Sequence, residues 1–131
     1  MATLLVNAGQ AIGAGRLLGA TPTQAEPKFI GIGSGAGTTA AGDTTLFTEY
    51  TTGTWAGYAR TSNAGTQVTT TNANDTAQWQ GTFTAGAAQT VTNAANFDAA
   101  SAGNMFVKGD FTGVALANGD SIQITIKLKV A

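Results

Sequence analysis

Side chains that could carry out catalysis are few in this sequence of 131 residues. It contains no histidine and no cysteine, so it lacks the commonest general base, the commonest transition-metal ligand and any thiol. A serine–histidine–aspartate triad therefore cannot be assembled. Most of the aspartates stand where caps or turns are typical, and no calcium-loop pattern occurs. We therefore expect a protein that is not an enzyme and that binds no cofactor and no metal. The carboxylates are Glu26, Asp43, Glu49, Asp75, Asp98, Asp110 and Asp120.

Two short motifs resemble binding sequences, but their contexts favour other roles. Residues 31–36 match a loose dinucleotide fingerprint, yet glycines and threonines follow where a phosphate-binding helix would have to begin. Residues 33–42 instead predict a flexible surface loop. Lys108-Gly109-Asp110 resembles a cell-adhesion tripeptide. Inside a predicted strand we interpret it as two outward polar residues flanking a small inward one.

Composition excludes several classes of partner. Charged residues make up 10% of the chain and the net charge is −1, against about 25% charged residues in typical soluble domains. Nucleic-acid binding needs clustered lysine and arginine, so we expect no nucleic-acid partner. The apolar runs are too short to span a membrane, and no secretory signal is expected at the start.

The elements that would position these side chains are short strands. Residues 121–130 alternate strictly between aliphatic and polar side chains, which is the clearest strand pattern in the chain. The turn sequence Asn118-Gly119-Asp120 precedes it, so we expect a hairpin with residues 104–114. Weaker patterns predict strands at residues 28–32, 44–50, 54–61, 65–71, 75–84 and 90–93. Such spacing predicts an all-β fold, an antiparallel sandwich or barrel-like domain over residues 27–131.

Residues 1–26 have a different pattern. Its apolar residues are interrupted by Gly9, Gly13 and Gly15, which would weaken a helix. Three interpretations stay open: an extended N-terminal arm that buries its leucines against another subunit, an extra strand, or a short helix near residues 11–18.

Several longer runs resemble small structural proteins of tailed bacteriophages. They are EPKFIGIGSGAG at residues 26–37, DTTLFTE at 43–49, NFDAASAGNMFVKGDF at 96–111 and LANGDSIQITIKL at 116–128. Together they cover roughly residues 26–130, and within that group the chain resembles capsid decoration, or cement, proteins. The resemblance implies a β-rich homotrimer on the outer surface of the virion head, where it would bind the major capsid protein and resist internal pressure. It implies no catalytic residues.

For such a protein we expect the apolar residues of the N-terminal segment and two aromatic residues to contact the capsid or a neighbouring subunit. The predicted contact residues are Leu4, Leu5, Val6, Ile12, Leu17, Leu18, Trp55 and Tyr58. Two other functions are compatible with the sequence. One is a tail-fibre or baseplate component with a receptor-binding role. The other is a carbohydrate-binding module that stacks sugars on Trp55, Tyr58 or Trp79.

Overall fold

The structure of the chain is a computed structural model that describes residues 2–19 and 25–130. Eight strands and one helix are defined within these ranges. In chain order they are β1 (Ala2–Leu5), α1 (Asn7–Leu17), β2 (Phe29–Gly33), β3 (Thr61–Ser62), β4 (Thr66–Val68), β5 (Thr76–Thr84), β6 (Gln89–Phe97), β7 (Met105–Leu116) and β8 (Ser121–Lys129).

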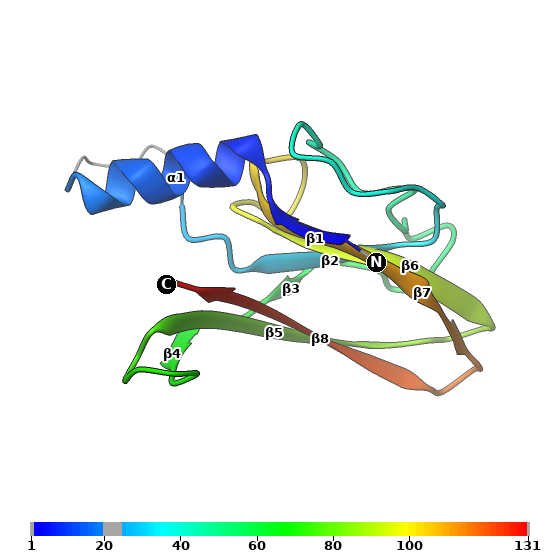
Figure 1. The fold of residues 1–131 in the computed structure, drawn as a ribbon. Helices are drawn as coiled ribbons and strands as arrows, with labels where there is room; N and C mark the ends of the chain where they lie inside the picture. Colours follow the sequence, from blue (N-terminus) through cyan, green and yellow to red (C-terminus); the bar gives the residue numbers. More distant parts are fainter. Residues whose placement is uncertain (1, 20–24, 131) are drawn as a thin grey trace.

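The strands form two sheets that pack face to face as a sandwich (Figure 1). The five-stranded sheet has the order β1-β7-β6-β2-β3, and the three-stranded sheet has the order β4-β5-β8. Every strand pairing is antiparallel. The all-β fold class expected from the sequence is therefore confirmed.

The two most regular strand patterns pair with each other. β5 and β8 are in register over nine residue pairs, from Thr76 opposite Lys129 to Thr84 opposite Ser121. The hairpin predicted between residues 104–114 and β8 is wrong, because β7 pairs with β6 and β1 instead. The Asn118–Asp120 turn does form, with Gly119 at a φ of 90°, but it leads the chain from one sheet to the other.

Burial explains this choice of partner. β8 is apolar on one face only, which suits a strand whose other face meets solvent. The first half of β7 is buried on both faces, from Met105 to Lys108. It therefore belongs inside the five-stranded sheet, where α1 and the loop of residues 34–48 cover the outer face.

Two predicted strands are not strands. Residues 44–50 contribute only an isolated bridge between Gly33 and Glu49, and of residues 54–61 only Thr61 belongs to a strand, β3. The intervening chain turns because threonine side chains bond to nearby backbone. The Thr51 N–H donates to the Thr54 hydroxyl at 2.9 Å, and the Trp55 N–H donates to the Thr51 carbonyl at 2.8 Å. Such local bonds compete with strand pairing.

The extended N-terminal arm is not confirmed. Residues 2–5 form an edge strand on β7, and α1 packs against the same strand. Both other interpretations are thus partly realised, although the helix starts four residues earlier than the sequence suggested. Gly9 permits this packing, since a Cβ there would overlap the Phe106 carbonyl oxygen. Residues 1 and 20–24 of the predicted arm, and residue 131, lie outside the described residues.

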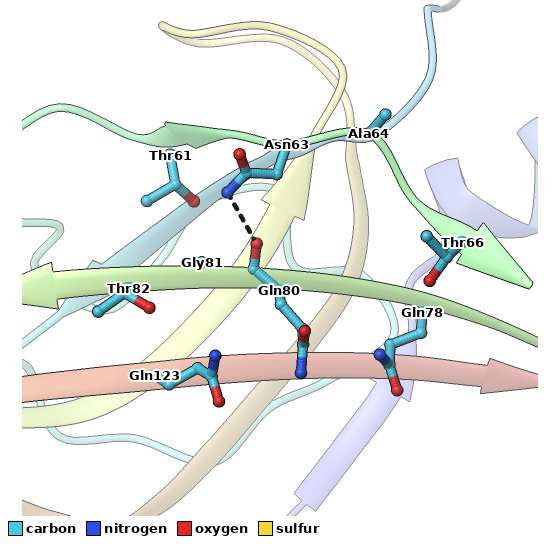
Figure 2. A pocket seen from close by; sticks show the side chains of 9 residues that line it. All are labelled: Thr61, Asn63, Ala64, Thr66, Gln78, Gln80, Gly81, Thr82 and Gln123. Atoms are coloured by element: carbon cyan, nitrogen blue, oxygen red, sulfur yellow. Dashed lines mark hydrogen bonds between the residues drawn. The ribbon is translucent and has the colours of Figure 1, made fainter. Parts of the chain in front are cut away.

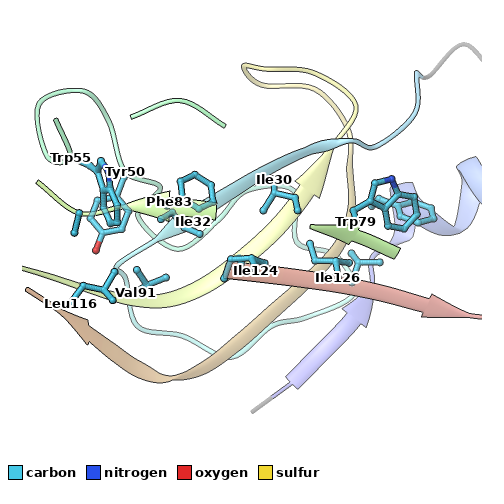
Figure 3. Packing of buried hydrophobic residues seen from close by; sticks show 14 of the residues in the cluster. Ile30, Ile32, Tyr50, Trp55, Trp79, Phe83, Val91, Leu116, Ile124 and Ile126 are labelled. Carbon is cyan, nitrogen blue, oxygen red and sulfur yellow. The ribbon is translucent and has the colours of Figure 1, made fainter. Parts of the chain in front are cut away.

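The main core lies between the two sheets (Figure 3). Ile30, Ile32 and Val91 from the larger sheet are fully buried, and they face the inward side chains of the smaller sheet. A second cluster of Val6, Leu46, Ala95, Phe97 and Met105 packs on the outer face of the larger sheet. The larger sheet therefore has apolar side chains buried on both of its faces, which accounts for many apolar residues of this weakly charged chain.

Candidate functional site

The first polar cluster ties three loops together around Arg60. Its guanidinium donates to both carboxylate oxygens of Glu49, at 2.8 and 2.7 Å. The remaining donors reach the carbonyls of Ala99 and Ala102 at 3.0 and 2.8 Å. The group also lies 3.6 Å from the ring centroid of Phe97. This bidentate, stacked geometry is one that arginine makes and lysine cannot.

Tyr58 belongs to the same cluster, and its hydroxyl both donates and accepts a hydrogen bond. It donates to Glu49 at 2.8 Å and accepts from the Ile32 N–H at 3.2 Å. Burial, together with the neighbouring Glu49, raises the pKa of Tyr58 well above its ordinary value. Burial alone would raise the pKa of Glu49, but hydrogen bonds from Arg60 and Tyr58 outweigh it and lower that pKa. Both carboxylate oxygens of Glu49 are thus occupied by bonds within the chain, and the cluster holds the three loops together.

A second ion pair lies on the outer face of the larger sheet. The Lys108 side chain is completely buried, and its ammonium donates to Asp43 at 2.8 Å and to the Thr45 carbonyl at 2.9 Å. The same ammonium lies 3.3 Å from the ring centroid of Phe47. Lys108 does point to the outer face of the sheet, as the sequence predicted, but it is not exposed to solvent, because the loop of residues 34–48 covers it.

That loop is packed, although its glycines predicted flexibility. The N–H groups of Ser34 and Gly35 donate to the carbonyls of Thr48 and Phe47. A Cβ at Gly37 would lie 2.7 Å from the Phe47 ring, so glycine is what lets the loop lie flat on that ring. Its polar anchors are Asp110, which accepts from the Thr39 N–H at 2.8 Å, and the buried Asn93.

The predicted contact residues separate into two groups. Val6, Ile12 and Trp55 are at most 4% exposed and belong to the chain's own core. Leu5 and Tyr58 are half-buried against that core. The exposed residues are Leu4, Leu17 and Leu18.

Leu17 and Leu18 form the most exposed apolar feature in the described part of the chain. They are 88% and 85% exposed at the C-terminal end of α1, and we call them the leucine tip. In Figure 1 this end of the helix extends beyond the strands. Gly13 and Gly15, on the same half of the helix, have open space where a side chain would stand. Packing among the described residues therefore explains neither the leucines nor these two glycines.

A polar groove lies on the outer side of the smaller sheet, where the chain crosses from β3 to the start of β4 (Figure 2). Its volume is about 390 Å³. Sequence reasoning placed its glutamines on the outer face of a strand but missed the groove, because the crossing segment that forms one wall has no periodic pattern. We call it the amide groove; it is lined by Thr61, Asn63, Ala64, Thr66, Gln78, Gln80, Gly81, Thr82 and Gln123.

Neither a metal-binding cluster nor a membrane-spanning helix occurs among the described residues. Residues 2–19 and 25–130 hold no cluster of three acidic side chains able to bind a metal ion. Their one helix is too short to cross a lipid bilayer. Neither a protein-family model nor a curated protein matches this sequence.

Proposed function

We propose that this chain is a structural protein of a tailed-bacteriophage virion. In this role it decorates the outer surface of the head as a homotrimer, binds the major capsid protein and stabilises the shell. The sequence runs that resemble cement proteins provide the starting point. The fold and the surface of the chain add physical support.

The resembling runs supply much of the internal bonding of this fold. Glu26 accepts from the Trp79 indole N–H at 3.1 Å and from the Gly65 N–H at 2.6 Å. Asp43 and Glu49 form the two ion pairs described above. These polar residues bond to other parts of the same chain. Such internal bonds are what residues of a structural scaffold are expected to make.

The leucine tip is the observation that carries the proposed attachment. Two neighbouring exposed leucines at the end of a packed helix form a small apolar patch, and exposed apolar patches mark interaction surfaces. Each patch is small, so stable attachment would come from several copies acting together in one oligomer. A trimer that holds three such tips over the shell meets that requirement.

Head binding tests this attachment. The Leu17→Asp/Leu18→Asp variant should lose co-sedimentation with undecorated heads while keeping its thermal unfolding midpoint, since both side chains lie outside the core. Val130→Asp is the matched control, because Val130 is 73% exposed and lies just beyond the end of β8, outside α1. If the double aspartate variant binds heads as tightly as the control, the leucine tip is not the attachment site.

Location on the particle distinguishes the two virion functions. A decoration protein should cover the head in many copies, and its mass in solution should be that of a trimer. A tail-fibre or baseplate component would instead be confined to the tail. A density map of the particle separates these outcomes, and a tail location would refute the decoration role. The amide groove is the feature that favours a receptor-binding role for a tail component.

A further inference from the structure

The amide groove has the dimensions and the rigidity of a binding site. Its volume of about 390 Å³ falls within the range of small-molecule sites, roughly 300–1,000 Å³. Its floor is formed by β5 and β8, which are paired over nine residues and cannot easily deform. Its upper wall is fixed by Asn63, whose side-chain amide donates to the Gln80 carbonyl at 3.1 Å (Figure 2).

The lining is polar but entirely uncharged. Four primary amides and three hydroxyls line it, and no acidic, basic or aromatic side chain does. In Figure 2 the amides of Gln123, Gln80 and Gln78 follow one another along β8. Each amide offers donors and an acceptor together. A ligand that presents several neutral hydroxyl groups would match such a surface, whereas an anion or a metal cation would find no opposite charge.

Much of this hydrogen-bonding capacity is unused. Gln80 is engaged, because its amide donates to the Thr125 hydroxyl at 3.2 Å. The side-chain amides of Gln78 and Gln123 have no protein partner among the described residues. The Thr61 hydroxyl is buried and is likewise without a partner in that part of the chain. A bound ligand can therefore replace water at these amides without breaking a hydrogen bond among the described residues.

An added peptide strand fits the groove less well. β4 pairs with β5 only up to Gln78, which leaves the next stretch of β5 without a strand neighbour on that side. However, the Asn63 side chain already donates to the backbone carbonyl of Gln80, and the Thr61 side chain lies directly against Gly81. These two side chains occupy the positions where an incoming backbone would have to pair.

We infer that the amide groove binds a neutral oligosaccharide. The sugar-stacking role considered for Trp55 and Trp79 is not the basis, because both rings are buried in the core at 4% and 7% exposure. Without an exposed ring, each groove binds weakly. Many copies on one particle would raise the overall avidity by about 10²–10⁴. That gain rests on the proposed virion function, whereas the groove's own affinity does not.

Side-chain amide resonances of ¹⁵N-labelled protein test the inference directly. Lactose, maltotriose and diacetylchitobiose are titrated separately, with inorganic phosphate and a neutral Thr/Gln tetrapeptide as comparisons. At least one sugar should shift the amide signals of Asn63, Gln78 and Gln123 in a saturable way. Gln123→Ala should weaken that binding by about tenfold, as expected for one lost hydrogen bond. Gln10→Ala, at an exposed glutamine on α1, should leave it unchanged.

Three results would overturn the inference. One is the absence of a saturable shift with every sugar at about 50 mM, well above a millimolar dissociation constant. Another is a Gln123→Ala variant that binds sugar as well as Gln10→Ala does. The third is a response to the tetrapeptide or to phosphate in place of the sugars. Because the titration uses isolated protein, its failure would leave the head-binding test untouched, and failure of head binding would leave this result standing.

Discussion

The buried ion pair between Lys108 and Asp43 predicts an asymmetric response to mutation. The Lys108 side chain is completely buried, whereas that of Asp43 is 21% exposed. Removing the carboxylate leaves a completely buried ammonium without its ion-pair partner. Removing the ammonium leaves a carboxylate that still accepts from the Ala40 N–H at 3.1 Å and can be hydrated. Asp43→Ala should therefore cost more stability than Lys108→Met.

The separation of charges sets the scale of this difference. At 2.8 Å the attraction is about 6 kcal/mol for an effective dielectric constant of about 20. Desolvation of Lys108 offsets part of it. Breaking a buried pair from the exposed side should then cost about 3–5 kcal/mol. Lys108→Met keeps most of the buried stem volume, so its cost should stay near 1–2 kcal/mol.

Urea unfolding of the two single variants and the double variant measures these values. The double variant Asp43→Ala/Lys108→Met should be more stable than Asp43→Ala alone, because it no longer buries an unpaired charge. A Lys108→Met variant that costs as much as Asp43→Ala would refute the reasoning. It would show that burial of the ammonium does not control the energetics of this pair.

Three further predictions concern α1, the Arg60 cluster and acid stability. Gly13→Ala should raise the free energy of unfolding by about 0.5–1 kcal/mol, because open space surrounds that position. Gly9→Ala should lower the free energy of unfolding, because its Cβ would overlap with β7. Thermal melts of the two variants measure this difference, and equal shifts of the midpoint would contradict it. Arg60→Lys should lower the free energy of unfolding by about 2–3 kcal/mol. It should also speed amide hydrogen exchange in residues 98–104, because Arg60 bonds to two carbonyls of that loop. Unchanged exchange would mean that other contacts hold this loop. The pKa values of Asp43 and Glu49 are both lowered on folding, so their stabilisation is complete above the ordinary carboxyl range. It should be lost as pH falls through the folded-state values, by up to about 1.4 kcal/mol per pH unit for each group. Urea midpoints that stay constant from about pH 5 to pH 2 would exclude this coupling.

The sequence predicted best where one physical rule decides the outcome. β5 and β8 alternate strictly, and a half-buried strand is what that pattern requires. The same rule cannot name a partner, since β7 and β5 offer β8 equally suitable neighbours, and only burial of both faces of β7 resolves the choice. Lys108 shows the limit most clearly. A lysine in an alternating strand predicts a solvated face, and only the covering loop, over sixty residues away in the chain, reverses that prediction.

The exposure of the leucine tip was predicted from the sequence, whereas the amide groove was not. Leu17 and Leu18 were expected to be contact residues because they belong to the apolar N-terminal segment that was interpreted as an arm, and they are exposed. Trp55 was assigned the same role, yet its ring lies 4.9 Å from that of Tyr50, inside the core. Aromatic residues in turn-rich segments carry no periodic signal that separates an inward from an outward ring. The groove was missed because the segment that crosses from β3 to β4 and forms one of its walls has no periodic pattern.

The position of β8 at the border of its sheet has a consequence for handling the protein. Among the described residues no strand covers the far side of β8, so a row of backbone groups over Ser121–Lys129 is open to another chain. Lys127 and Lys129 lie on the exposed face of this strand, and positive charge beside an open edge discourages stacking of molecules into fibrils. Amine-reactive dyes or acetylation would neutralise that protection. Labelled or acetylated preparations should therefore cluster at concentrations where the untreated protein stays dispersed.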